Sequence, residues 1–433
     1  EPFEPDVRLL ALDGSREEVV FATPEADEFL GWAPDGSGVL VGTEVEGVPQ
    51  VVHVPVEDGR AIGEPRTVLH DAWNFDPIGF ADDGRFFYTV RAGRKDAWEI
   101  GVDDATGQVM GAARPLSSAG IGVTTVADYS PDGRHVLLVH RPQNGPPGAS
   151  TLLVRSVDSG ETRVVDIRPR LLYAGRARWI PGTTSAVVRG RTGPGTATPV
   201  NFYRVDLQSG AATPLTDVQA PEVVMGYSMA VDGSALYFQT EEPRRDGDVY
   251  RIRAQDLSEE PGQGRLVWTV EGGEPDGRRY DGRPLARTFD LSPDGRTLAL
   301  RMAEVNIDGS GDRTSPILLL PTEGGPPTRR IEVDGGESSV LWHPSGREIW
   351  ATTEVPESDP QTLMLSRIDL EDGSVREAGL ERPGLGTGAQ MWGSLRFSPD
   401  AGALAFTAGR ELLELWVLEE ASEARTSKTI RDR

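Results

Sequence analysis

The stretch "WAPDGSGVLVGTE" at residues 32–44 joins a tight turn to an alternating apolar run. In the turn, proline presets φ, aspartate bonds to its own backbone, and glycine accepts a positive φ. Alternating runs of this kind, such as "RFFYTVRA" at residues 85–92, place every second side chain on one face, as a half-buried strand requires. The stretch therefore predicts a turn between two β-strands.

The same pattern occurs eight times along the chain. The copies, numbered here as repeats one to eight in chain order, read "GWAPDGSGVLVGTE", "GFADDGRFFYTVRA", "DYSPDGRHVLLVHR", "RWIPGTTSAVVRGR", "SMAVDGSALYFQTE", "DLSPDGRTLALRMA", "LWHPSGREIWATTE" and "RFSPDAGALAFTAG". The turn glycines Gly36 and Gly84 lie 48 residues apart, and Gly295 and Gly346 lie 51 apart. A period of about 50 residues in a strand-rich chain predicts the blades of a β-propeller.

Most repeats continue with a third strand and often a fourth, as in "STLLVRSVDSGETRVVDI" at residues 150–167. Four strands in each of eight repeats predict an all-β fold, a single eight-bladed β-propeller over residues 1–420, followed by a polar tail at 421–433. The first residues, "DVRLLALDGSREEVVF", have the form of a third and fourth strand, and repeat eight has no clear fourth strand. We expect these N- and C-terminal strands to pair and close the ring, since an open ring would expose sheet edges. One strand is surplus, and either "VRLLAL" or "EEVVF" could make the pairing.

Composition excludes several classes of function. The net charge of −24 argues against a nucleic-acid partner, which requires a basic surface. The chain has no cysteine, so thiolate metal sites and cysteine nucleophiles are excluded, and its five histidines form no zinc motif. No apolar run has the length of a membrane span. The sequence starts without methionine, and from this we expect a leader removed from a periplasmic or secreted protein, or a piece of a longer chain.

The "SPDG" turn followed by "RHVLLVHR" or "RTLALRMA" resembles the WD40-like repeat of TolB-type propellers. It also resembles the propeller repeat of prolyl-oligopeptidase and dipeptidyl-peptidase enzymes. The resemblance covers nearly the whole chain and implies the fold more than the function, because such propellers serve many roles. The resemblance is to the propellers alone: TolB carries a small α/β domain before its propeller and the peptidases carry an α/β-hydrolase domain, and we expect neither within these 433 residues.

Three short motifs resemble a catalytic, a calcium-binding and a phosphate-binding motif, but each is better explained as an ordinary strand or loop. "GYSMA" at residues 226–230 is close to a nucleophile elbow but lies in a strand with no following helix, so we expect Ser228 to be a strand residue. "NIDGSGD" at 306–312 resembles a calcium loop without its final glutamate, which leaves Asp308 and Asp312 as a weak calcium candidate in an ordinary loop. "GLGTGAQMWG" at 384–393 lacks the lysine and hydroxyl of a phosphate loop.

The tryptophans divide into two groups. Trp32, Trp179 and Trp342 occupy equivalent positions before the turn, where we expect a large side chain to pack between blades. Trp73 and Trp392 lie in loops before inner strands and are candidates for ligand contact.

The mouth of the central channel is the default binding site of a propeller. The residues that the register places there are Glu28, Trp73, Phe75, Asp76, Tyr173, Arg176, Arg287, Met391 and Trp392. Arg176 and Arg287 have the fork geometry that holds a carboxylate or a peptide terminus. Solvated loop residues or inter-blade ion pairs explain each of these positions equally well.

These observations predict a non-enzymatic binding or scaffold propeller outside the cytoplasm, a monomer with no cofactor and no membrane insertion. Its partner is expected to be a protein, a peptide or an envelope polymer. One alternative is the propeller of a serine peptidase whose hydrolase domain is absent from this chain. Another is the sensor domain of a membrane-anchored kinase or regulator.

Overall fold

The structure, a computed structural model, describes most of the chain. The residues that it does not describe are 1–5, 24–26, 46–47, 71, 73–74, 82, 104–105, 118–121, 143–148, 194–197, 245–248, 272–283, 303–315, 334–338, 355–362, 378–389, 419–427 and 430–433. Every element of regular secondary structure among the described residues is a β-strand, as predicted from the alternating apolar runs.

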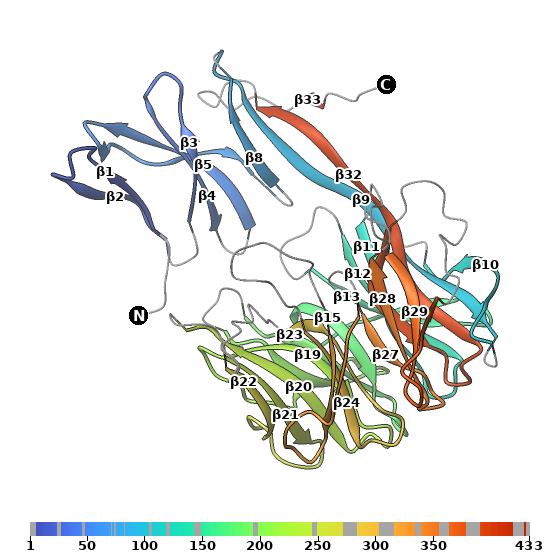
Figure 1. Cartoon of the computed structure of the whole chain (residues 1–433). Coiled ribbons are helices and arrows are strands. Elements are labelled where there is room, and N and C mark those ends of the chain that lie inside the picture. Colours follow the sequence, from blue (N-terminus) through green and yellow to red (C-terminus); the bar gives the residue numbers. More distant parts are fainter. Residues whose placement is uncertain are drawn as a thin grey trace.

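Repeats three to seven each contribute four antiparallel strands (Figure 1). The strands of repeats four to seven form four separate four-stranded sheets, and those of repeat three belong to a ten-stranded sheet in which its inner strand also pairs with β9 (Phe86–Val102). The strands of these five repeats are β11 (Gly122–Tyr129), β12 (His135–Pro142), β13 (Thr151–Ser156) and β14 (Thr162–Val165); β15 (Leu172–Trp179), β16 (Ser185–Arg191), β17 (Asn201–Asp206) and β18 (Ala212–Pro214); β19 (Val223–Met229), β20 (Ala235–Glu242), β21 (Val249–Asp256) and β22 (Arg265–Glu271); β23 (Pro284–Leu291), β24 (Thr297–Met302), β25 (Ile317–Pro321) and β26 (Arg329–Ile331); β27 (Val340–Trp342), β28 (Glu348–Glu354), β29 (Leu363–Asp369) and β30 (Val375–Glu377).

A sixth set of four strands is assembled from both ends of the sequence. It consists of β31 (Gln390–Phe397), the first half of β32 (Ala403–Leu418), the second half of β9 (Phe86–Val102) and β10 (Val109–Pro115). Its apolar side chains pack against β27–β29 on one side, through Leu404 and Trp350, and against β11–β13 on the other, through Ala405 and Val126. Within the described residues, six blades therefore form a closed ring.

Contacts between the turns confirm the order of the blades. In neighbouring blades, a Cβ at the turn glycine of the later repeat would lie against the turn proline of the earlier one, as for Gly346 and Pro293 at 3.9 Å. The same relation joins Gly133 of repeat three to Pro399 of repeat eight at 3.6 Å. Repeat three thus follows repeat eight directly around the ring.

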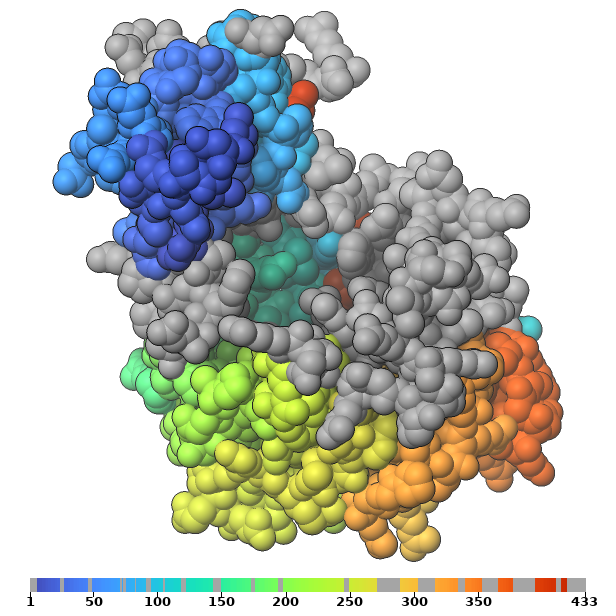
Figure 2. Space-filling model, turned by 60° about the vertical axis from the view of Figure 1, so that its left-hand side comes forward, coloured from blue at the N-terminus to red at the C-terminus, as the bar shows by residue number. Residues whose placement is uncertain are grey.

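Repeats one and two lie outside this ring and form what we call the arm. The arm consists of β1 (Val7–Leu10), β2 (Glu17–Phe21), β3 (Glu28–Trp32), β4 (Gly38–Val45), β5 (Val48–Glu57), β6 (Arg60–Ala61), β7 (Arg66–Leu69), β8 (Phe75–Phe80), the first half of β9, the second half of β32, and β33 (Lys428–Thr429). Figure 2 shows the arm in blue at the upper left, standing apart from the green, yellow and orange surface of the ring.

The predicted four-stranded antiparallel sheets are confirmed, and the predicted count of eight blades is not. Repeats one and two keep their strands but do not surround the channel with the others. The predicted closure by the chain ends is not confirmed either, because β1 pairs with β2, and β32 pairs with β9 of repeat two. The division into residues 1–420 and a tail at 421–433 stays a prediction, since only 428–429 of that tail are described.

The burial of the three equivalent tryptophans differs between the ring and the arm. Trp342 is buried between the sheets of repeats six and seven, and Trp179 packs against the core shared by repeats three and four. Trp32, on the arm, is 47% exposed. The predicted inter-blade packing is therefore confirmed in the ring and absent for Trp32.

The turn at Gly133 offers a direct test of the hairpin geometry. Gly133 has φ of 70°, and a side chain there would have ordinary contact distances, so the cost of replacing it is conformational. We expect Gly133→Val to lower the free energy of unfolding by about 1–2 kcal/mol, measured by urea denaturation. Gly133→Asn is the control and should cost less, because asparagine tolerates this conformation. Equal stability of the valine variant and the wild type would contradict the turn assignment.

Aspartates in the turns should make the fold sensitive to acid. The backbone N–H of Ser209, together with the Ser209 and Thr184 hydroxyls, lowers the pKa of Asp206 from 3.8 to about 2. This stabilisation is present above the unfolded pKa and is lost as pH falls through the folded value. We expect wild type to have a higher melting temperature than Asp206→Asn at about pH 5 and no advantage near pH 2. A difference that is constant over this range would refute the assignment.

Candidate functional site

Most repeats of the ring carry a polar side chain at one position of the inner strand. This position lies three residues before the turn proline, as Asp128 does before Pro131. The residues at this position in repeats three to eight are Asp128, Arg178, Ser228, Asp290, Leu341 and Arg396. The corresponding residues of repeats one and two are glycines, Gly31 and Gly79. Because inner strands converge on the axis of a propeller, this position forms a polar layer across the channel.

Side chains of this layer bond to the backbone of the next blade. The Asp128 carboxylate accepts the Trp179 N–H at 2.9 Å, and Asp290 accepts the Trp342 N–H at 3.0 Å. The Ser228 hydroxyl accepts the Leu291 N–H at 3.2 Å and donates to Asp290 at 2.9 Å. The polar layer therefore joins neighbouring blades as well as lining the axis.

The same type of bond joins repeat eight to repeat three. Arg396 Nε donates to the Ala127 carbonyl at 3.1 Å, and the Val126 N–H donates to the Thr407 hydroxyl at 3.1 Å. These two bonds connect β31 and β32 to β11 and close the ring of six.

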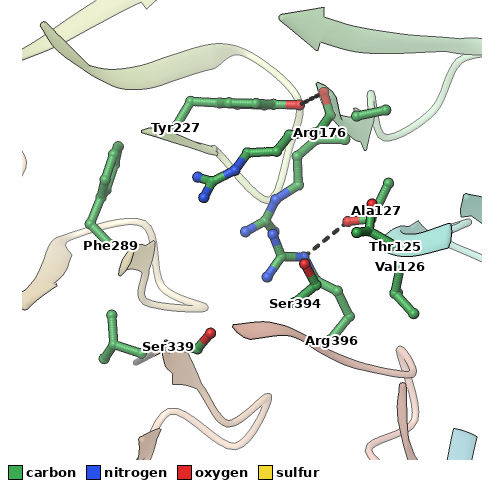
Figure 3. Close-up of a pocket in the computed structure, with 12 residues that line it drawn as sticks. Thr125, Val126, Ala127, Arg176, Tyr227, Phe289, Ser339, Ser394 and Arg396 are labelled. Atoms are coloured by element: carbon green, nitrogen blue, oxygen red, sulfur yellow. Dashed lines mark hydrogen bonds between the residues drawn. The ribbon is translucent and has the colours of Figure 1, made fainter. Parts of the chain in front are cut away.

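Three arginines gather at the centre of the channel (Figure 3). Arg176 and Arg178 come from β15 and Arg396 from β31, and they surround a cavity of about 30 Å³, the space of roughly one water molecule. Arg178 is paired with Asp290 at 3.1 Å, while its Nε is buried without a hydrogen-bond partner among the described atoms. Two carboxylates, Asp128 and Asp290, interact electrostatically with both Arg178 and Arg396.

Burial and the crowding of like charges perturb these groups. Desolvation, and then the positive charge of Arg178, lowers the pKa of Arg396 to about 10. Desolvation raises the pKa of Asp128, against the opposing effect of Arg178. Against the effect of desolvation, Asp290 and Asp128 in turn raise the pKa of Arg178, so the guanidinium and carboxylate groups at the centre of the channel interact with one another while buried.

Arg176 is held in an unusual backbone conformation. Its φ is 60°, a left-handed value that costs a residue other than glycine about 1–2 kcal/mol. Its carbonyl accepts a hydrogen bond at 3.2 Å from the buried Tyr227 hydroxyl, which also lies 2.9 Å from the Val187 carbonyl. Packing and these bonds hold Arg176 in place at the cavity.

Of the predicted channel residues, Arg176 is the one that lines this cavity. Glu28 lies on β3, and Phe75 and Asp76 lie on β8, so these three belong to the arm. Phe75 packs there in an aromatic cluster with Phe86 and Tyr88. Their assignment to a binding site stays a prediction.

The other predicted residues fall wholly or partly outside the described part of the chain. Tyr173, Arg287, Met391 and Trp392 have their backbones in strands, and their side chains are not described. Trp73, Asp308 and Asp312 lie outside the described residues altogether. Ser228 lies within β19, as predicted, and its hydroxyl takes part in inter-blade bonds.

Sequence reasoning missed Asp128, Arg178, Asp290 and Arg396. A signal for them was present, because all four occupy the same place in their repeats and a charged residue recurs where an inner strand approaches the axis. Aligning the repeats column by column would have found this layer, whereas the search concentrated on loops at the channel mouth.

A larger hollow of about 590 Å³ lies between repeats three and four at the ends of the turns. It is lined by turn residues such as Asp132 and Thr183, with His135 and Trp179 beside one another at 6.3 Å between ring centroids. The channel centre differs from it in drawing charged side chains from several blades. Among the described residues, no cluster of three or more histidine, aspartate or glutamate side chains has the arrangement of a metal site.

No family model and no curated protein matches this chain. Solved structures that are similar to it include TolB from Acinetobacter baumannii, at 11% identity and a TM-score of 0.42, covering 86% of this chain and 79% of that one. Hydrazine synthase of Kuenenia stuttgartiensis has 18% identity, a TM-score of 0.42, and coverage of 67% and 72%. A structure from a study of two prolyl endopeptidases has 10% identity and a TM-score of 0.39; the match covers 90% of this chain and 54% of that one.

TolB and a prolyl endopeptidase are thus among the similar structures, and both are kinds of protein whose repeat the sequence resembles. The described residues include no helix long and apolar enough to cross a membrane.

The polar layer can be tested at Asp290, which contacts Arg178, Ser228 and the Trp342 N–H. We expect Asp290→Ala to destabilise the fold by about 3–5 kcal/mol, because it leaves a buried guanidinium uncompensated. Glu332→Ala is the control: its pair with Arg330 is exposed and should be worth about 0–1 kcal/mol. Urea denaturation of both variants measures the difference. Similar losses in the two variants would show that the layer is not a structural centre.

Proposed function

We propose that this chain is a non-enzymatic binding propeller whose channel arginines hold a carboxylate of a protein or peptide partner. The gathering of Arg176, Arg178 and Arg396 around one cavity is the observation that carries the proposal. Arginine presents a planar fork of donors that matches a carboxylate, and such charge-assisted bonds are about twice as strong as neutral ones.

The size of the cavity limits what enters it. A space of about 30 Å³ admits little more than one small group, so the partner's chain would lie at the channel mouth and only its carboxylate would approach the arginines. A carboxyl terminus satisfies this requirement better than an internal side chain, because it projects freely from the end of a chain. The negative net charge of the protein, −24, would confine favourable binding of an anion to the arginine cluster.

Location outside the cytoplasm is part of the same proposal. It is supported by the resemblance of the repeat to TolB-type propellers. Fractionation of the native cells into cytoplasm, periplasm and medium tests it.

Fluorescence anisotropy tests the binding proposal with a random library of labelled peptides, each prepared with a free and with an amidated carboxyl terminus. We expect binding of free termini, with a loss of about 10- to 100-fold on amidation or in Arg176→Ala, the range for a lost charged hydrogen bond.

Arg60→Ala is the matched control, because Arg60 is exposed on the arm and pairs with Glu18. It should bind like wild type. Equal affinity for free and amidated peptides, or binding that survives in Arg176→Ala, would refute the arginine site. Binding of a polyanionic polysaccharide without any peptide binding would refute the choice of partner.

A further inference from the structure

Strands β9 and β32 are long, and both run from the ring into the arm (Figure 1). They pair antiparallel without interruption, from Gly101 opposite Ala403 to Phe86 opposite Leu418. The midpoint of this pairing has Arg94 opposite Arg410. At this midpoint the ring strand β11 also pairs in parallel with β9, with Gly122 opposite Arg94 and Val123 opposite Lys95.

The midpoints of the two strands fall at nearly the same place in two repeats: Gly93 lies nine residues after the turn residue Gly84, and Gly409 lies eight after Ala401. Repeat two reads "YTVRAGRKDAWEI" and repeat eight reads "AFTAGRELLELWV", with Ala-Gly-Arg at residues 92–94 and 408–410. In repeats three to seven the chain turns back at this place, so that the second strand pairs with the third, as β12 does with β13 and β20 with β21. In repeats two and eight it runs straight on.

Two sheets of mixed origin result. The ring sheet takes its inner half from repeat eight and its outer half from repeat two, through β31, β32, β9 and β10. The arm sheet takes β8 and the start of β9 from repeat two, and the end of β32 from repeat eight. Each repeat has therefore exchanged its outer half with the other. Folding both Ala-Gly-Arg segments into hairpins would return each half to its own repeat.

The arm is built like a run of consecutive blades. One face of the repeat-one sheet packs on repeat two through Leu40, Val51 and Tyr88, and a Cβ at Gly31 would lie 3.8 Å from the Phe80 ring. Its other face, through Val39 and other residues, is covered by the β1–β2 hairpin. In a propeller that second face meets the preceding blade, which here would be repeat eight. The hairpin thus occupies the place where the outer strands of repeat eight would lie.

The arm also exposes apolar surface that a ring would cover. Of the fifteen large hydrophobic side chains that are exposed among the described residues, nine belong to the arm: Leu10, Leu12, Val19, Phe29, Trp32, Val45, Ile62, Ile78 and Leu415. Phe29, Trp32 and Ile78 lie on the inner strands β3 and β8. An eight-bladed ring would bring the inner strands β3 and β8, which carry three of these residues, to the channel.

We propose that the chain has a second state, an eight-bladed ring, reached by folding residues 92–94 and 408–410 into hairpins. In this change the ring opens within its mixed sheet, where β32 separates from β9. Repeat one and the inner half of repeat two, which form most of the arm, then insert between these two strands as additional blades. The other blade contacts, such as those of Leu404 with repeat seven and Ala97 with repeat three, are kept. The second state displaces the β1–β2 hairpin from the repeat-one sheet and gives up the parallel pairing of β11 with Arg94 of β9.

The polar layer explains why the closed ring of six is stable. Repeats one and two have Gly31 and Gly79 where ring repeats have Asp128 or Arg396, so they bring no side chain for inter-blade bonds. Their entry would break the bond from Arg396 to the Ala127 carbonyl and leave it unreplaced. Eight inner strands would also surround a wider channel than six do. The second state goes beyond the proposed binding role and does not depend on it.

Cysteine pairs distinguish the two states, and the chain contains no cysteine of its own. Thr89 and Leu415 are opposite one another in the paired strands, so Thr89→Cys with Leu415→Cys should form a disulfide in the described state. Thr89 and Trp98 lie nine residues apart on β9, about 30 Å in an extended strand, and cannot be bridged. A two-residue turn at 93–94 would place them opposite each other.

The experiment oxidises both pairs in the full-length protein and separates monomer from dimer on non-reducing gels. We expect the Thr89–Trp98 pair to form an intramolecular disulfide in a fraction of wild-type chains. Replacing Gly93-Arg94 and Gly409-Arg410 by Asn-Gly, the preferred hairpin turn, should raise that fraction at least about threefold. Gly93→Val with Gly409→Val, which disfavours the turn, is the matched control and should lower it.

The outcomes are decisive in both directions. The Thr89–Leu415 disulfide shows that each protein is folded and that oxidation was complete. If it forms while the Thr89–Trp98 disulfide is missing even with Asn-Gly turns, the second state does not exist. A Thr89–Trp98 disulfide found only in dimers would mean that the halves exchange between two chains, and would overturn an intramolecular switch. Small-angle scattering should show a smaller radius of gyration for the Asn-Gly protein than for the valine control.

Discussion

The antiparallel pairing of β9 with β32 is the interaction on which the rest of the structure depends. Its lower half, between residues 95–101 and 403–409, completes the sixth blade and so closes the ring. Its upper half, between 86–91 and 413–418, attaches repeats one and two to the remainder of the protein. A propeller needs closure because an open ring leaves sheet edges and half a core exposed. Here one pair of strands supplies the closure and also sets the arm apart.

A polar layer on the inner strands acts together with this pairing. Apolar contacts between blades do not by themselves select which blades are neighbours, since many β-branched and aromatic residues pack acceptably between twisted sheets. The directional bonds from Asp128, Ser228, Asp290 and Arg396 to the next blade are specific, because each needs a partner at a fixed place. Arg396 belongs both to these bonds and to the arginine cluster, and Arg178 of the cluster pairs with Asp290, so the means of joining blades and the candidate binding site share side chains.

The arginine cluster illustrates how stability and binding conflict in such a centre. Burial is the main cause of the lowered pKa of Arg396, and the positive charge of Arg178 lowers it further, while Asp290 and Asp128 act in the opposite direction. An incoming carboxylate would act in the same direction as these two carboxylates, which gives the site a physical reason to prefer anions. Opening of the ring would separate Arg396 from β11 and change the same electrostatics.

The sequence by itself determined the strands, the turns and the four-stranded sheets, because alternation of apolar residues and turn chemistry are local properties. The Gly133 turn and the position of Ser228 in a strand followed from neighbouring residues alone. The sequence did not reveal which repeats surround the channel, since the halves of β9 and β32 have equally good partners in either repeat and only their long-range pairing selects one. For the same reason Arg178 and Arg396, 218 positions apart in the sequence, were recognised as neighbours only in the tertiary structure. Local patterns specify how a repeat folds; contacts between distant segments decide how many repeats share one ring.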